Sequence, residues 1–185
     1  MMLKRFCLVL AGFVALFSAS TSWAQMKIGY IDPQQILQNY KPFQEADREY
    51  KRYEEELGRE YAKLENELKT MRERYDRQAL LLSEQRKQEE QQAIRKKQED
   101  LQRFLMEIQD PASGKLTRKN QALSEPIIRE VNEIIQQVAK DSGYDFLLNT
   151  AALAYANEAH DLTQKVMEAL EKQLEEKVKK AAKTQ

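Results

Sequence analysis

The sequence has few of the residues that build disulfide-bonded or loop-rich globular domains. In 185 residues it contains one cysteine, one histidine, four prolines and five glycines. The cysteine, Cys7, lies within residues 1–24, so the rest of the chain has no thiol for a disulfide bond. Charged residues make up 32% of the chain, which is typical of long helices and leaves little room for a large globular core. We therefore expect stability to come from helix packing and oligomerisation.

The sequence also lacks the motifs of an enzyme or a cofactor-binding protein. No G-x-x-x-x-G-K-[ST] segment is present to cradle phosphate groups, so nothing indicates the use of ATP. His160, the sole histidine, precedes the expected helix cap Asp161 and has no partner set for a metal ion or a general base. The formal net charge is zero, which gives no general attraction to nucleic acid or anionic lipid. We expect no catalysis, no cofactor, no metal site and no nucleic-acid partner.

The segment 1–24 differs from the rest of the chain. Lys4 and Arg5 precede an apolar run over residues 6–17, and residues 22–24 (Ser-Trp-Ala) place small side chains where signal peptidase reads them. A transmembrane anchor needs about 20 consecutive apolar residues, more than this run supplies. We expect a secretory signal peptide that is cleaved after Ala24, a periplasmic location and no stable membrane anchor.

One apolar stripe dominates residues 43–82. Its members recur in steps of three and four, and five such steps lead from Phe43 to Tyr61 and another five from Tyr61 to Ala79. The mean step equals the period of an α-helix, about 3.6 residues. An ordinary two-stranded coiled coil would give a similar pattern. A single narrow stripe on a long charged helix cannot bury itself alone, so a second helix is expected to pack against it. The stripe consists of Phe43, Ala46, Tyr50, Tyr53, Leu57, Tyr61, Leu64, Leu68, Met71, Tyr75, Ala79 and Leu82.

The partner helix is expected in the residues that follow. A second apolar stripe covers residues 94–138 and is interrupted at 110–114, where a proline and a glycine break the helix. Residues 79–85 lie near the middle of the helical region and contain a candidate N-cap serine. We therefore predict an antiparallel helical hairpin over residues 43–142 with its tip at 79–85. The interruption has two open interpretations, a hinge or a static bulge that absorbs an insertion.

Strand-prone segments lie at both ends of the expected mature chain, and we predict that they form a small antiparallel sheet. These segments are residues 26–31, 144–148 and 153–155. Asp32 is expected to cap a short helix, and Gly143 to end the long one. The predicted fold is mainly α with a small β body (α+β): residues 25–42 and 143–185, with a C-terminal helix, form the body, and residues 43–142 form the hairpin. The expected body core and subunit interface is Ile28, Tyr30, Phe146, Leu148 and Tyr155.

Four further segments carry a family resemblance. They are residues 27–37 (KIGYIDPQQIL), 81–84 (LLSE), 138–149 (VAKDSGYDFLLN) and 161–170 (DLTQKVMEAL). In this order, on either side of a long charged hairpin, they resemble the Skp/OmpH family of periplasmic chaperones. The resemblance implies a homotrimer whose three hairpins project like tentacles from a β body around a cavity. It also implies that the cavity holds unfolded outer-membrane proteins without ATP and prevents their aggregation.

A holdase of that kind needs scattered apolar contacts, because it must release its client again. The candidate client contacts are Leu80, Leu81, Leu82, Phe104 and Met106. Family members often carry a basic hairpin surface, whereas this chain is near neutral, a departure that bears on capture by charge. The alternative function is a structural coiled-coil spacer or envelope tether in the periplasm, without client binding. A tether would need an anchor or a peptidoglycan-binding module, and neither is visible after residue 24, which favours the chaperone.

Overall fold

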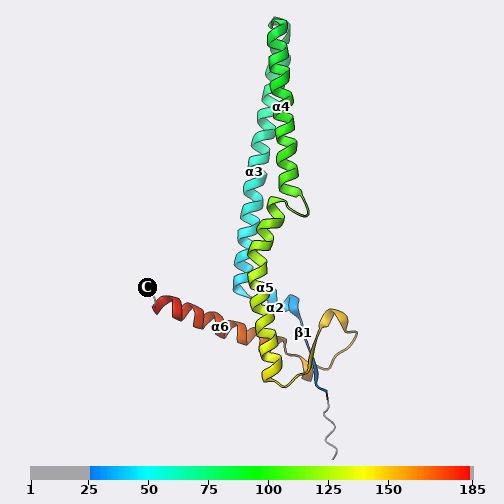
Figure 1. The fold of residues 1–185 in the computed structure, drawn as a ribbon, viewed down its shortest axis with the longest axis vertical. Coiled ribbons are helices and arrows are strands. Elements are labelled where there is room, and N and C mark those ends of the chain that lie inside the picture. Colours follow the sequence, from blue (N-terminus) through cyan, green and yellow to red (C-terminus); the bar gives the residue numbers. More distant parts are fainter. Residues whose placement is uncertain (1–25, 184–185) are drawn as a thin grey trace, which may run out of the picture.

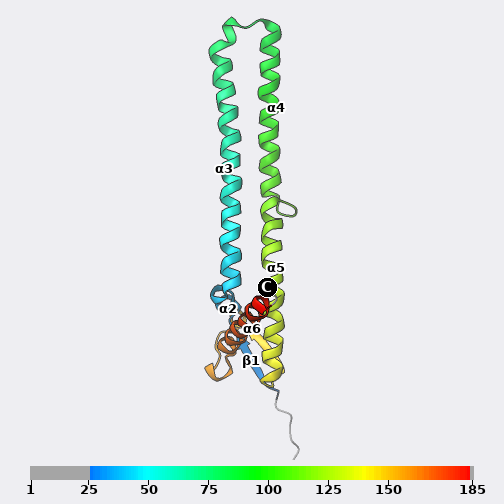
Figure 2. The same cartoon turned by 90° about the vertical axis from the view of Figure 1, so that its left-hand side faces the viewer.

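The computed structural model describes residues 26–183. It consists of a long helical hairpin that stands on a small body made from the two ends of the chain (Figures 1 and 2). The last helix, α6 (Thr163–Lys183), crosses the base of the hairpin at a steep angle (Figure 1). The mainly helical fold with a small β body is therefore confirmed. The predicted signal peptide, residues 1–24, lies outside the described residues.

Three long helices form the hairpin. They are α3 (Lys41–Gln78), α4 (Glu84–Gln109) and α5 (Lys115–Asp141). The predicted tip is confirmed, because α3 ends in a 3-10 turn, η1 (Ala79–Leu81), and the next helix begins after Ser83. The Ser83 hydroxyl caps α4 by accepting a hydrogen bond from the backbone N–H of Arg86. Pro126 lies inside α5, which continues through it.

The apolar stripe of α3 faces the descending arm. Every member of the stripe predicted over residues 43–82 is buried or half-buried, and Leu57 and Leu68 are fully buried. Polar pairs flank this apolar seam. The Glu67 carboxylate accepts a hydrogen bond from Lys97 Nζ at 2.5 Å, and this pair marks the antiparallel register of α3 and α4.

The register of the two arms changes at residues 110–114. Lys97 pairs with Glu67, and Lys119 pairs with Glu49, each at 2.5 Å. Between these two pairs the descending arm is longer than the rising arm by one turn of α-helix, about four residues. The predicted interruption is confirmed, and the extra turn forms a loop that projects outward between α4 and α5 (Figure 1).

The sheet has two parallel strands, so the predicted antiparallel sheet is wrong. β1 (Ile28–Ile31) pairs with β2 (Phe146–Asn149), with Gly29 opposite Leu147. Parallel strands need a long crossover connection, and here the whole helical hairpin is that connection. Gly143, with a φ of +67°, ends the descending arm as predicted and turns the chain into β2.

The third predicted strand, residues 153–155, does not form. The Asn149 side chain accepts a hydrogen bond from the backbone N–H of Ala151 and caps a 3-10 turn, η2 (Thr150–Ala152). Asparagine bonds of this local kind compete with strand pairing, and the chain leaves the sheet at this turn. A second 3-10 turn, η3 (Glu158–His160), follows before α6.

Helices supply most of the core of the body. α2 (Pro33–Asn39), α5 and α6 pack around Ile36 and Val166, which are both 0% exposed. Asp32 caps α2 as predicted, accepting a hydrogen bond from the backbone N–H of Gln35. The other buried members of this cluster are Ile31, Tyr40, Ile127, Val131, Ile134, Leu162 and Leu170.

The five residues predicted as body core and subunit interface differ in their burial within the single chain. Tyr30 is buried, but Ile28, Phe146, Leu148 and Tyr155 are 45%, 55%, 41% and 86% exposed. The reason is the face that β1 turns toward the helices. Gly29 and Ile31 face the helices and are buried. On the other face of β1, Ile28 stays exposed, whereas Tyr30 is covered near Asp161, with which it forms a β-bridge.

Gly29 makes this choice of face possible. A Cβ added to Gly29 would lie 2.7 Å from Leu162 Cδ1 and 2.8 Å from the Tyr144 ring. Glycine therefore lets the strand approach the Leu162 and Tyr144 side chains without a clash.

Candidate functional site

The tip of the hairpin presents two leucines to solvent. Leu80 is 97% exposed and Leu81 is 86% exposed, whereas the neighbouring Leu82 is half-buried. The short turn η1 produces this arrangement, because it ends the helix before the apolar run is complete. Figure 2 shows that the turn after α3 lies at the far end of the hairpin. Within the described residues, its two adjacent leucines form a small apolar contact surface that stays exposed.

Charges beside this tip are balanced. Lys87 Nζ lies 2.7 Å from the Glu84 carboxylate, and Arg86 lies 3.1 Å from the carboxylate of Glu89. The hydrogen bond to Glu84 raises the pKa of Lys87. Arg77 lies within 3.9 Å of Glu73 on the rising helix. The tip therefore offers apolar contact within a zwitterionic surface and no strong field of one sign.

The other predicted client contacts lie far from the tip. Met106 is 59% exposed near the lower end of α4, and Phe104 is half-buried. Lys115 Nζ lies 4.7 Å from the centroid of the Phe104 ring, so this ring is partly covered by a cation–π contact. About 20 residues of helix separate this pair from the tip, which is roughly 30 Å. The five predicted contacts therefore do not form one surface. The three leucines lie at the tip, and Phe104 and Met106 lie near the lower end of α4, where their spacing of two residues turns the side chains in different directions.

The outer face of the sheet is a further apolar surface. Ile28 lies opposite Phe146 in the parallel pair, and Leu148 follows on the same side of β2. All three side chains are more than two-fifths exposed. Met26, just before β1, is 61% exposed. We call these four residues the outer sheet face. Ile28, Phe146 and Leu148 belong to the predicted body core and subunit interface, whereas Met26 was not predicted.

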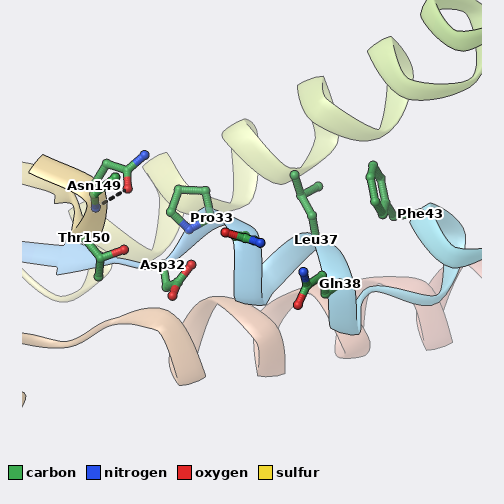
Figure 3. Close-up of a pocket in the computed structure, with 9 residues that line it drawn as sticks. Asp32, Pro33, Leu37, Gln38, Phe43, Asn149 and Thr150 are labelled. Carbon is green, nitrogen blue, oxygen red and sulfur yellow. Dashed lines mark hydrogen bonds between the residues drawn. The ribbon is translucent and has the colours of Figure 1, made fainter. Parts of the chain in front are cut away.

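A cleft of about 670 Å³ opens beside this sheet, between the start of α2 and the end of β2 (Figure 3). It is lined by Asp32, Pro33, Gln34, Leu37, Gln38, Phe43, Asn149, Thr150 and Ala151. Its carboxylate and one of its amides are engaged by the backbone, since Asp32 caps α2 and Asn149 caps η2. The remaining walls are largely apolar, which suits packing of a side chain better than chemistry. Sequence reasoning missed this cleft because the turn η2 creates it.

Within residues 26–183 the structure shows no group of three or more histidine, cysteine or acidic side chains placed to hold a metal ion. His160 is exposed in η3, beside Asp161, whose carboxylate accepts a hydrogen bond from the Thr163 N–H.

Among the helices of residues 26–183, none is long and apolar enough to cross a membrane. The hydrogen bond from Lys119 lowers the pKa of Glu49.

Comparison with known proteins places the chain in a family. Among curated proteins, no sequence matches it. A crystal structure of a candidate outer membrane chaperone (OmpH-like) from Caulobacter crescentus CB15 has the same fold, with a TM-score of 0.72 at 19% identity. The alignment covers 81% of this chain and 86% of the Caulobacter chain. The family described as outer membrane protein (OmpH-like) matches residues 27–170, which is well over half of the sequence, and the chain therefore belongs to that family.

Proposed function

We propose that this protein is an ATP-independent periplasmic holdase chaperone, and not an enzyme. Its clients would be unfolded outer-membrane proteins, which it keeps from aggregating on their way to the outer membrane. Membership of the OmpH-like family and the fold shared with a candidate outer membrane chaperone support this function. The signal-like segment at residues 1–24 supports the periplasmic location.

The exposed pair Leu80 and Leu81 is the observation that carries this proposal. Unfolded barrel proteins expose alternating apolar residues and unpaired strand edges, which aggregate in water. Small apolar spots at the tip and near Met106 would each bind such a chain weakly. Several weak contacts on one client hold it through their combined effect and still allow release.

We further propose that the protein is a homotrimer, with the outer sheet face in the subunit interface. Two short strands with one uncovered apolar face are too little to be stable alone, so another surface is expected to cover them. Ile28, Phe146 and Leu148 offer such a face on the body, next to the apolar cleft of Figure 3. The number three comes from the family resemblance.

The test is suppression of aggregation. A urea-unfolded outer-membrane barrel is diluted into buffer with the chain that begins at residue 25, and turbidity is followed with and without ATP. The proposal expects turbidity to fall to the same extent in both cases, because the sequence has no phosphate-binding loop. Turbidity unchanged across several different barrels would contradict it and favour the spacer or tether.

A pair of variants tests whether suppression of aggregation depends on the tip. Leu80→Ser combined with Leu81→Ser removes the exposed leucines, and we expect several-fold more chaperone to be needed for the same suppression. Val178→Ser changes a side chain on α6 that is 61% exposed and serves as the control. Equal activity of the two variants would remove the tip from the proposed site.

A further inference from the structure

Gly58 occupies a position in α3 where packing does not require glycine. A Cβ added to Gly58 would meet no atom within 4 Å. Glycine inside a helix weakens it relative to alanine, because its backbone loses more freedom on folding. α3 is continuous over 38 residues, and Gly58 is therefore a position where this helix is locally less stable.

Gly58 lies opposite the break at residues 110–114 of the descending arm. Starting from the Glu67–Lys97 pair, Leu57 lies ten residues below Glu67, and Ile108 lies eleven residues below Lys97. Leu57 and Ile108 are therefore at the same height, and both are buried, at 6% and 7% exposure. Gly58 follows Leu57 directly, and α4 ends one residue after Ile108. The rising arm therefore has a helix-weakening glycine, and the descending arm has its break, at the same distance from the tip. The buried side chains of Leu57 and Ile108 lie between these two positions.

Hydrogen bonds that converge on Asp110 hold the break closed. Its carboxylate accepts from the Ala112 N–H at 2.9 Å and from the N–H and hydroxyl of Ser113 at 2.6 and 3.1 Å. Its backbone carbonyl oxygen accepts from the Gly114 N–H at 2.8 Å and from Thr117 Oγ1 at 3.2 Å. The bonds from Ser113 and Ala112 lower the pKa of the Asp110 carboxyl, because they favour its charged form.

Lys115 adds a second connection across the break. Its Nζ lies 3.4 Å from the Glu107 carboxylate and 4.7 Å from the centroid of the Phe104 ring. Contacts of this kind between exposed side chains are individually weak. Across the break, α4 and α5 are therefore joined by the hydrogen bonds to Asp110 and by the contacts of Lys115, and each helix also packs against α3.

We propose that Gly58 and residues 110–114 form one hinge that involves both arms. The hydrogen bonds accepted by Asp110 stabilise the straight form of the hairpin. The upper hairpin, residues 59–109, bends at this level as a unit relative to the body. Leu57 and Ile108 remain packed as the pivot. The tip leucines and Met106 lie on the moving unit, so the hinge changes their distance from the body. This inference does not depend on client binding and is tested without a client.

Hydrogen–deuterium exchange of the chain that begins at residue 25 tests the hinge. Amides in residues 54–62 and 110–116 are expected to exchange faster than their neighbours on either side. Gly58→Ala is expected to slow exchange in both segments by about fivefold, because alanine strengthens the helix and makes opening rarer. Asp110→Ala is expected to speed exchange in both. Thr70→Ala, at an exposed site of the same helix, is the control and should leave residues 110–116 unchanged.

The coupling between the two arms is the decisive outcome. If Gly58→Ala slows exchange in α3 only, or if Asp110→Ala acts only on its own loop, the two sites are independent and the hinge is wrong. Spin labels on Gln88→Cys and Asn132→Cys give a second measurement. Their distance distribution should narrow in the Gly58→Ala background. A distribution that is already narrow in the parent chain would overturn the proposal.

Discussion

Thr163 Oγ1 accepts a hydrogen bond from the backbone N–H of Asp32 at 2.9 Å, across 131 residues of sequence. Asp32 precedes α2, and Thr163 is the first residue of α6, so this bond joins the two ends of the chain in the body. Thr163 is 3% exposed, so a water molecule has little access to take the place of its hydroxyl as the acceptor. The Thr163 hydroxyl therefore adds a buried polar link between two helix starts, next to the bond from the Leu162 N–H to the Tyr30 carbonyl oxygen at 2.9 Å.

Thr163→Val tests this link. Valine has nearly the same shape but leaves the Asp32 N–H without its acceptor, which costs about 1–3 kcal/mol. We expect a lower thermal midpoint at fixed protein concentration, measured by circular dichroism. Thr163→Ser keeps the hydroxyl and is the matched control. A midpoint for Thr163→Val equal to that of the parent chain would show that the bond contributes nothing.

Gly58 and Gly114 are expected to respond to alanine in opposite directions. Gly58 has open space around it, so Gly58→Ala should stabilise the chain by about 1 kcal/mol. At Gly114 an added Cβ would lie 2.5 Å from the backbone oxygen of Asp110, and Gly114→Ala should destabilise it by about 1–3 kcal/mol. Urea unfolding of both variants measures the two signs. The same sign for both would contradict the geometry of the break.

Acid should weaken the hairpin through its paired carboxylates. Hydrogen bonds from Lys119 and Lys97 lower the pKa of Glu49 and of Glu67 below the ordinary 4.5. A lowered folded-state pKa contributes stability that is present above the unfolded value and is lost as pH falls through the folded value. Glu67→Gln should therefore lower the thermal midpoint at pH 7 and lose that effect toward pH 3. Glu60→Gln, at an exposed site on α3, is the control, and an effect of Glu67→Gln that persists at pH 3 would exclude the ion pair as its cause.

The outer sheet face should control the oligomeric state. Leu148 is 41% exposed in the single chain, so Leu148→Asp leaves the helical core intact but places a charge in the proposed subunit interface. We expect light scattering to change from a trimer to a monomer, with helical circular dichroism retained. Val178→Asp is the control and should remain a trimer. A parent chain that is monomeric at micromolar concentration would contradict the proposed assembly.

The hairpin could be predicted from the sequence because its signal is periodic and long. The stripe from Phe43 to Leu82 repeats over many turns, and each member packs as its period indicates. The tip followed from the balance of the two arms and from Ser83, which acts as the cap that its residue type favours. The existence of the break followed from Pro111 and Gly114 in the same way.

The strand direction and the core of the body could not be predicted in this way. A short strand such as β1 carries no information about its direction, and that direction was decided by the crossover through the hairpin. Which face of β1 is buried depends on Gly29, whose neighbours Tyr144 and Leu162 come from the far end of the chain. The one-turn change of register is likewise visible only in the pairs Glu67–Lys97 and Glu49–Lys119, which join different helices.

The central claim is that copies of this chain enclose an unfolded barrel protein. Native mass spectrometry of the chain that begins at residue 25, mixed with a urea-unfolded outer-membrane barrel and diluted from urea, tests it most directly. We expect one main species with the mass of three chains and one barrel, present without ATP. Free single chains beside aggregated barrel would contradict both the assembly and the holdase function.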